Sequence, residues 1–291
     1  MLLDEFEPIV RPAEPLAPHT RFQLGGPAEY FAEPRDAAEL ARLVQRCQQE
    51  ELPLRLLGGG SNILVRDEGV PGLVIRLPEA GFGQIEVRGR RVIAGGGARL
   101  GHVISMAVRE GLAGLEALVG IPGTIGGALH GNAGSRGGDI GQWAESATVL
   151  TPAGELSQRS RDEMVFAYRQ SNLDALVILA VEFELESDDP DQLTKRMQQQ
   201  WIVKKAAQPL AHQSAGCIFK NPRGMSAGLL IEQAGLKGTR VGGAEVSDRH
   251  ANFIVAEPGA TSQDVLRLIE LVRSRVADRL GMELELEIEI W

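Results

Sequence analysis

The sequence predicts an α+β protein of about two domains. At 291 residues the chain is long enough to bury two substantial hydrophobic cores. Apolar residues recur at helical spacing in some segments and alternate at strand spacing in others, and both kinds of segment are mixed along the chain. Glycine-rich loops at 58–62 and 120–134 interrupt these segments. Ordering so much glycine costs backbone entropy, and a ligand lying against the main chain is the usual compensation.

The first loop follows a strand expected at 54–57 and precedes a short strand expected at 63–65. A Rossmann dinucleotide fold requires an amphipathic helix directly after its glycines. Only three apolar residues follow here before the charged stretch 66–68, so there is no room for that helix. The sequence therefore predicts a strand–loop–strand motif, which we expect to bind a diphosphate.

The second loop reads GIPGTIGGALHGNAG, with six glycines in fifteen residues. Pro122, Thr124 and Ile125 are typical of the start of a short helix, where free N–H groups point outward. Such a helix start favours an anion, and diphosphate is the natural candidate. The alternative is a tight bend between two strands of a sheet.

The remaining elements follow from apolar periodicity and from end signals. In the helix expected at 36–49, Leu40, Leu43, Val44 and Cys47 share one face, which makes Cys47 a core residue. The final helix starts near Thr261 and ends at Gly281. Its expected buried stripe is Val265, Leu268, Ile269, Val272, Val276 and Leu280. Further helices are expected at 100–108, 191–206 and 226–234, and further strands at 70–77, 85–87, 91–94, 146–150, 176–185 and 282–291.

Composition excludes several classes of protein. The net charge of −9 argues against a general nucleic-acid binder, and 43% apolar with 24% charged residues is ordinary for a globular protein. No apolar stretch reaches membrane-spanning length, and the acidic start lacks the basic region of a signal peptide. Two cysteines can form neither a disulfide framework nor a zinc cluster. We expect a cytoplasmic monomer without a metal site or membrane partner.

Several motifs together resemble one family. LGGGSNILV at 57–65 and GIPGTIGGALHGNAG at 120–134 look like the two flavin loops of UDP-N-acetylenolpyruvoylglucosamine reductases. The similarity continues in the same order nearly to the end of the chain, with HTRFQLGGPAEYF at 19–31, YRQS at 168–171, SAGCIFKNP at 214–222, AGLLIEQAGLKG at 227–238 and HANFIVA at 250–256. The tyrosine-bearing loop of longer members has no evident counterpart, so the chain resembles the shorter, type II subclass.

The resemblance implies an FAD-binding region of the vanillyl-alcohol-oxidase type and a C-terminal α/β substrate-binding domain. It implies FAD-binding subdomains at 1–75 and 76–187, a substrate domain at 188–281 and a C-terminal strand at 282–291. FAD is expected to be noncovalent, because the first loop offers no histidine or cysteine, although His130 lies in the second. The implied cofactor-binding residues are Gly58, Gly59, Gly60, Ser61, Asn62, Ile63, Leu64, Gly120, Ile121, Pro122, Gly123, Thr124, Gly126, Gly127, Ala128, Asn132, Ala133 and Gly134.

The resemblance also implies the chemistry. NADPH reduces FAD, and flavin N5 then transfers hydride to the vinyl carbon of UDP-N-acetylglucosamine enolpyruvate, which gives UDP-N-acetylmuramate. Arg169 and Glu287 are expected to stabilise the enolate. Cys217 is expected to donate the proton, at a position where the family usually has serine. The implied substrate-binding residues are Tyr168, Lys220, Asn221, Gln233 and His250.

Each role has a structural alternative. Cys217 and His250 could be core residues, and Arg169 could form a surface ion pair. Leu286 replaces the family's proline, so Glu285 competes with Glu287 for the active-site register. On a regular strand Glu283, Glu285, Glu287 and Glu289 would share one face. Two other functions stay open, namely a sibling flavin oxidase or dehydrogenase and a noncatalytic nucleotide-sugar sensor.

Overall fold

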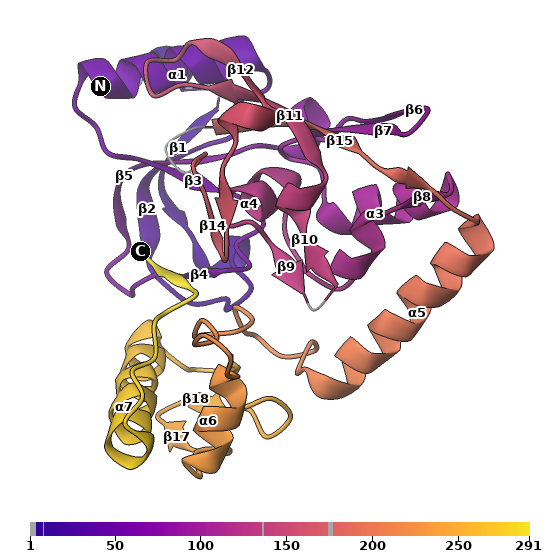
Figure 1. Ribbon diagram of the computed structural model, residues 1–291. Coiled ribbons are helices and arrows are strands. Elements are labelled where there is room, and N and C mark those ends of the chain that lie inside the picture. The colour runs from indigo at the N-terminus through magenta and orange to yellow at the C-terminus, as the bar shows by residue number, and fades with distance from the viewer. Residues whose placement is uncertain (1–3, 8, 136, 174–176) are drawn as a thin grey trace. The chain divides into compact units, whose positions relative to one another are not determined.

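A computed structural model describes residues 4–7, 9–135, 137–173 and 177–291 (Figure 1). Its contacts divide the chain into two compact units. The first unit comprises residues 1–12, 30–59 and 72–203, and the second comprises 13–29, 60–71 and 204–291. The chain thus enters the second unit three times. The four-part division expected from the sequence stays a prediction.

Two sheets organise the first unit. In the five-stranded sheet the order is β12-β11-β15-β7-β6, and all neighbours are antiparallel. The other sheet has the order β1-β2-β5-β3, in which β3 and β5 are parallel. The strands of these sheets are β1 (Val10–Pro15), β2 (Pro27–Ala32), β3 (Leu54–Leu57), β5 (Val70–Arg76), β6 (Ile85–Arg88), β7 (Arg91–Gly95), β11 (Ala144–Leu150), β12 (Leu156–Ser160) and β15 (Val177–Glu184). Strands β1, β2 and β5 continue across the border into the second unit.

Short helices and hairpins complete the first unit. The helices are η1 (Asp4–Phe6), α1 (Ala37–Gln49), α2 (Glu79–Phe82), α3 (Leu100–Arg109), η3 (Leu115–Leu118), α4 (Ile125–His130), η4 (Ile140–Gln142) and η5 (Arg161–Glu163). The two-residue strands are β8 (Leu112–Ala113), β9 (Gly134–Ser135), β10 (Gly138–Asp139), β13 (Phe166–Ala167), β14 (Gln170–Ser171) and β16 (Glu186–Ser187). Helix α5 (Pro190–Ala207) begins in this unit and ends in the other.

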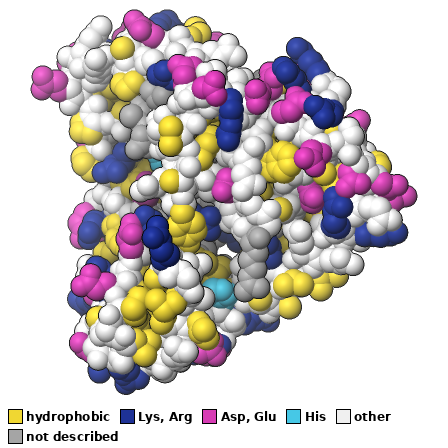
Figure 2. Space-filling model, in the orientation of Figure 1, with side chains coloured by type: hydrophobic (Ala, Val, Ile, Leu, Met, Phe, Trp, Pro, Cys, Tyr) yellow, Lys and Arg dark blue, Asp and Glu magenta, His cyan; other side chains and the backbone are white. Residues whose placement is uncertain are grey.

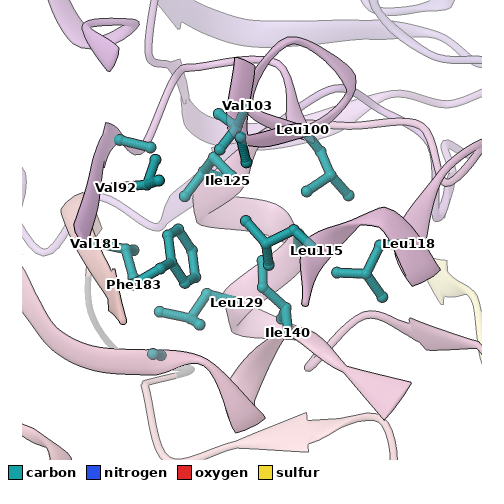
Figure 3. Close-up of a cluster of buried hydrophobic side chains, with 14 of the residues drawn as sticks. Val92, Leu100, Val103, Leu115, Leu118, Ile125, Leu129, Ile140, Val181 and Phe183 are labelled. Carbon is teal, nitrogen blue, oxygen red and sulfur yellow. The ribbon is translucent and has the colours of Figure 1, made fainter. Parts of the chain in front are cut away.

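Two hydrophobic clusters hold the first unit together. The larger one packs α3 and α4 against the five-stranded sheet; Figure 3 labels Val92, Leu100, Val103, Leu115, Leu118, Ile125, Leu129, Ile140, Val181 and Phe183. The smaller one covers the apolar face of α1, including Leu40, Leu43, Val44 and Cys47. The expected core faces of the helices at 36–49 and 100–108 are therefore confirmed.

The second unit has its own core between two helices and a small sheet. The antiparallel sheet has the order β17-β18-β19. The helices and strands of the second unit are η2 (Ala17–His19), β4 (Ile63–Leu64), α6 (Ala227–Gln233), β17 (Arg240–Val241), β18 (Ala244–Val246), β19 (Ile254–Ala256), α7 (Ser262–Leu280) and β20 (Glu289–Ile290). Figure 1 shows α6 and α7 beside β17 and β18.

Helix α7 has the ends that its sequence predicts. Thr261 and Asp264 form a reciprocal capping box, and Gly281 ends the helix with φ 65°. Its apolar stripe is buried from Val265 to Val276. The expectation for Leu280 was wrong, since this side chain is 36% exposed in the last turn.

The C-terminal segment differs from the strand expected at 282–291. Only β20 is regular, and it pairs in parallel with β4. Residues 285–287 instead run antiparallel to the segment 218–220. A change of partner in mid-segment prevents one continuous ladder, so the expected strand was wrong in its length.

The distribution of charged side chains on the surface agrees with the ordinary composition of the chain. Figure 2 shows acidic and basic side chains interspersed over the visible face, without a large field of one sign. Among the described residues, no helix is long and apolar enough to cross a membrane.

Candidate active site

The two glycine-rich loops approach each other main chain to main chain within the first unit. A Cβ atom on Gly59 would lie 2.7 Å from Cα of Gly123, and one on Gly58 would lie 2.9 Å from Oγ1 of Thr124. The backbone contact leaves no room for a side chain at Gly59, whereas a side chain at Gly58 would have to displace the Thr124 hydroxyl. Glycine is therefore required for the approach itself, and the pair of loops presents backbone rather than side chains.

The start of α4 differs from the anion site predicted for it. Its first N–H groups are used inside the protein: Ile125 donates to Ala98 O at 2.9 Å, Gly126 to Gly96 O at 2.8 Å and Gly127 to Thr124 Oγ1 at 3.3 Å. The prediction that these donors point outward was wrong. The carbonyl groups of the loop around Gly96 and the Thr124 cap already accept these N–H groups, so the N–H groups are not available to a ligand.

Main-chain donors remain in the first loop. Among the residues that the structure describes, the N–H groups of Gly59 and Gly60 donate to no other atom of the chain. Consecutive backbone donors of this kind can bind an anion. Ile63 and Leu64 were also expected to bind the cofactor, but their side chains are buried in the second unit.

Arg169 lies at the tip of a tight hairpin in the first unit. Strands β13 and β14 pair Phe166 with Ser171 and Ala167 with Gln170, which leaves Tyr168 and Arg169 as the turn. Arg169 has φ 59°, a left-handed conformation that costs a non-glycine residue about 1–2 kcal/mol. Its guanidinium carbon lies 5.2 Å from the centre of the Tyr168 ring. A two-residue hairpin turn requires a positive φ at one of its residues, so the turn itself accounts for this conformation.

Two hydrogen bonds attach this hairpin to the second glycine loop. Asn132 Nδ2 donates to Ala167 O at 2.8 Å, and Ser171 Oγ donates to His130 O at 2.8 Å. Asn132 also accepts the N–H of Gly141 at 3.0 Å and is 2% exposed. Its side-chain amide is therefore occupied within the protein. The first unit thus joins the Arg169 turn to both glycine loops.

Cys217 lies in a segment enclosed on two sides within the second unit. On one side Cys217 bridges Phe253. On the other side Ile218 O accepts the N–H of Glu287 at 2.8 Å, and Phe219 bridges Leu286. The second unit therefore brings the candidate acid Cys217 beside the segment that carries Glu287.

The two cysteines have different environments. Cys47 is 2% exposed in the core of the first unit, and burial raises the pKa of its thiol to about 11. Cys217 is half-buried, and neither cysteine forms a disulfide. The core role expected for Cys47 is confirmed, whereas Cys217 remains accessible in part.

The C-terminal glutamates differ in how far their side chains are buried. Glu287 is half-buried, whereas Glu283, Glu285 and Glu289 are exposed. Asn62 of the first loop holds the backbone here: its Nδ2 donates to Glu287 O at 2.9 Å, and its O accepts the Glu289 N–H at 2.9 Å. The burial pattern distinguishes Glu287 from its neighbours.

The residues expected to bind substrate lie in varied surroundings. Lys220 forms an ion pair with Glu285, and Asn221 Oδ1 accepts the N–H of Ala227 near the start of α6 at 2.9 Å. Gln233 is exposed at the end of α6. Burial, aided by the charge of nearby Lys237, lowers the pKa of the His250 imidazole, whose ring packs edge-on against Phe253. Neutral His250 therefore suits a packing role as well as a ligand contact.

Sequence reasoning missed two polar residues of this region. Asn252 is 2% exposed and hydrogen-bonds to the backbone of Phe219. Ser214 is 5% exposed, and its Oγ has no hydrogen-bond partner among the described residues. Both belong to motifs that carry the family resemblance, HANFIVA and SAGCIFKNP, but a motif alone does not reveal which side chain supports which backbone. In the described parts of the chain, no group of three or more His, Cys, Asp or Glu could hold a metal ion.

Comparison with known proteins defines the class. Residues 28–159 match an FAD-binding domain, and residues 208–291 match the C-terminal domain of UDP-N-acetylenolpyruvoylglucosamine reductase. With its α+β fold and its paired glycine loops, the protein is a flavoprotein oxidoreductase. The chain belongs to the UDP-N-acetylenolpyruvoylglucosamine reductase family of peptidoglycan synthesis, in its shorter type II form.

Individual relatives match over nearly their whole length. A reductase of Symbiobacterium thermophilum is 46% identical, over 97% of this chain and 92% of its own. One of Listeria innocua is 41% identical, over 95% and 93%. The crystal structure of the Thermus caldophilus reductase superposes with a TM-score of 0.85 at 39% identity, and covers 97% of this chain and 98% of that one.

Proposed function

We propose that this protein reduces UDP-N-acetylglucosamine enolpyruvate to UDP-N-acetylmuramate, with NADPH as the source of hydride. The observation that carries the proposal is a backbone pairing. Residues 218–220, which follow Cys217, pair with residues 285–287, which include Glu287. This pairing brings the segment that follows Cys217, whose thiol can donate a proton, beside the segment that carries the half-buried Glu287. The substrate follows from the names of the relatives, which are reductases of this nucleotide sugar.

The glycine loops fit the cofactor. Gly59 lies so close to the backbone of Gly123 that a side chain is excluded, and the N–H groups of Gly59 and Gly60, which have no acceptor among the described residues, suit a diphosphate. Gly59 and Gly60 would hold the diphosphate of FAD, and the bound flavin would supply the chemistry for moving hydride between NADPH and the substrate's vinyl carbon. The first loop contains no histidine or cysteine, so the proposed attachment is noncovalent.

Three side chains would act on the substrate. The planar guanidinium of Arg169 can bind the substrate carboxylate through two hydrogen bonds and stabilise the negative charge that spreads over the enolate. Glu287 assists in positioning that intermediate. Cys217 then gives its S–H proton to the carbon beside the carboxylate, and the resulting thiolate takes a proton from solvent.

The remaining groups would bind the nucleotide sugar. Lys220 offers a charge to the diphosphate, while Tyr168, Asn221, Gln233 and His250 offer neutral contacts. Glu285 already pairs with Lys220, so diphosphate would compete with this carboxylate. The reaction is proposed for a monomer in the cytoplasm, where NADPH and nucleotide sugars are made.

The two half-reactions test the proposal separately. NADPH should bleach the visible flavin band of the purified protein, and UDP-N-acetylglucosamine enolpyruvate should restore it anaerobically. Arg169→Ala should reduce NADPH-driven bleaching little while slowing reoxidation by about 10²–10³-fold, the range for loss of one group that stabilises an oxyanion. Arg88→Ala removes an exposed arginine paired with Glu86 and serves as the control.

Other outcomes would point elsewhere. Rapid reoxidation by oxygen without the sugar would indicate an oxidase of the same fold. Binding of the nucleotide sugar without any reoxidation would indicate a sensor. Equal damage to both half-reactions in Arg169→Ala would make that arginine structural.

A further inference from the structure

The side chain of Asn252 binds the backbone of Phe219 in two directions. Asn252 Oδ1 accepts the Phe219 N–H at 2.9 Å, and Asn252 Nδ2 donates to Phe219 O at 2.7 Å. Both hydrogen bonds are buried, and Asn252 is 2% exposed. The side-chain amide thus replaces the peptide group that a neighbouring strand would offer.

The main chain of Asn252 adds a third contact to the same segment. Its carbonyl accepts the Ile218 N–H at 2.8 Å. On the opposite side, Ile218 O accepts the Glu287 N–H and Lys220 N–H donates to Glu285 O, both at 2.8 Å. Every backbone polar group from the Ile218 N–H to the Lys220 N–H is therefore paired, and Asn252 supplies three of the five partners.

Cys217 itself bridges Phe253, the residue after Asn252, whereas Gly216 before it is less restrained. Gly216 has φ 82°, and a Cβ atom at Gly216 would meet nothing within 4 Å. A glycine in open space can change conformation easily. The direction of the Cys217 side chain therefore depends on its own bridge to Phe253 and on the segment 218–220, whose backbone Asn252 holds.

We infer that Asn252 is a positioning residue that fixes the backbone after Cys217 and thereby aims its thiol. This inference rests on the proposed role of Cys217 as proton donor. Asn252 acts through Ile218 and Phe219 rather than on the reacting atoms. A displacement of about 1 Å in a catalytic group can cost about 10²-fold in rate.

Asn252→Asp provides a reversible test. A protonated carboxyl has one acceptor and one donor and can reproduce both hydrogen bonds of the amide. The ionised form has no donor, and its charge faces Phe219 O. Burial and that carbonyl raise the pKa of the introduced carboxyl, so the hydrogen bonds should return as pH falls.

The expected result has two readouts, each taken as a ratio to wild type at the same pH. At pH 8 the reoxidation rate constant with the enolpyruvyl sugar should fall by about 10–10²-fold, while KM for the sugar and NADPH-driven reduction stay within about twofold. Alkylation of Cys217 by iodoacetamide should become several times faster, because the segment is loosened. Both ratios should move back towards one as pH is lowered.

Matched variants separate positioning from general destabilisation. Asn172, an exposed residue of the first unit, also accepts from one backbone group (Val165 N–H) and donates to another (Glu163 O), so Asn172→Asp should leave Cys217 alkylation unchanged. Asn252→Ser should lose rate without recovery at low pH, because one hydroxyl cannot make both bonds. It keeps the test decisive if Asn252→Asp fails to fold at pH 8.

Several results would overturn the inference. One is a lower melting temperature with reoxidation, alkylation and KM all unchanged, which would make Asn252 structural only. Another is a loss of rate in Asn252→Asp that does not depend on pH. If wild type fails to turn over the sugar, the proposed function fails, while the alkylation arm still decides whether Asn252 holds Cys217.

Discussion

Burial gives the two cysteines different chemistry. Cys47 lies in the core of the first unit with a pKa of about 11, whereas Cys217 is half-buried. If the Cys217 thiol donates the proton, Cys217→Ala should slow reoxidation by about 10²–10⁴-fold, the usual contribution of general acid catalysis. Cys217→Ser should stay active, because a hydroxyl can also donate. Stopped-flow reoxidation of the reduced protein measures both.

The control for this prediction is the other thiol. Cys47→Ala should lower the melting temperature by removing a packed core group while leaving turnover of the folded protein near normal. Turnover of Cys217→Ala within about threefold of wild type would remove Cys217 from the proposed role. Glu287 would then be the next candidate for the acid.

The exposure of their side chains predicts which of the C-terminal glutamates takes part in the reaction. Glu287→Gln should slow reoxidation by about 10²-fold, since it removes a half-buried charge beside the Cys217 segment. Glu285→Gln should retain turnover and change mainly the affinity for UDP, because Glu285 is exposed and pairs with Lys220. Rate constants and UDP titrations for the two variants decide the register, and the reverse pattern would assign the role to Glu285.

Among the elements, the start of α1 carries a buried carboxylate, Glu39, beside its Asp36 cap. Glu39 accepts hydrogen bonds from the Arg35 N–H and guanidinium, both at 2.7 Å, and its side chain is 6% exposed. These bonds, the one from the guanidinium above all, lower the pKa of Glu39. A carboxyl with a lowered folded-state pKa stabilises the fold above its unfolded-state value, and this stabilisation is lost as pH falls through the folded-state value.

Glu39→Gln should therefore reduce the free energy of unfolding by about 1.5–3 kcal/mol at pH 7, the range for a hydrogen bond to a charged group. The difference from wild type should shrink as pH falls below about 4. Urea unfolding of both proteins at each pH measures it. Glu86→Gln, at an exposed pair with Arg88, should change little. A constant difference across pH would show that packing, and not charge, supports this helix start.

At the scale of the whole molecule, FAD should stabilise the fold by mass action. Binding at 100 times its dissociation constant adds about 2.7 kcal/mol to the free energy of unfolding. Removing FAD should lower the melting temperature, and adding it back should restore it. Gly59→Ala should abolish this response, because its Cβ would press on Gly123.

A second glycine gives the control. Gly101 lies in α3, and a Cβ atom there would meet nothing within 4 Å, so Gly101→Ala should keep the response to FAD. Differential scanning fluorimetry with and without added FAD compares the variants. An undiminished FAD response in Gly59→Ala would contradict the close approach of the two loops as part of the cofactor site.

Much of the secondary structure followed from the sequence. The stripes in α1 and α3, the cap at Thr261 and the stop at Gly281 all appear as expected, since they depend on residues within a few positions of each other. The errors lie where distant segments compete. The N–H groups of α4 are taken by the loop around Gly96 and by a cap, and residues 282–291 change partner halfway.

Periodicity, glycine content and motif order are local or linear properties, so they are enough to assign the α+β class, the two glycine loops and the ordered motifs of the family. The tertiary fold was needed to show which glycine admits no side chain, which C-terminal glutamate is half-buried and that Asn252 holds the backbone after Cys217. These features depend on hydrogen-bond and packing partners far away in the chain. Tertiary packing selects these partners and pairs nearly all buried polar groups, which no local sequence pattern specifies.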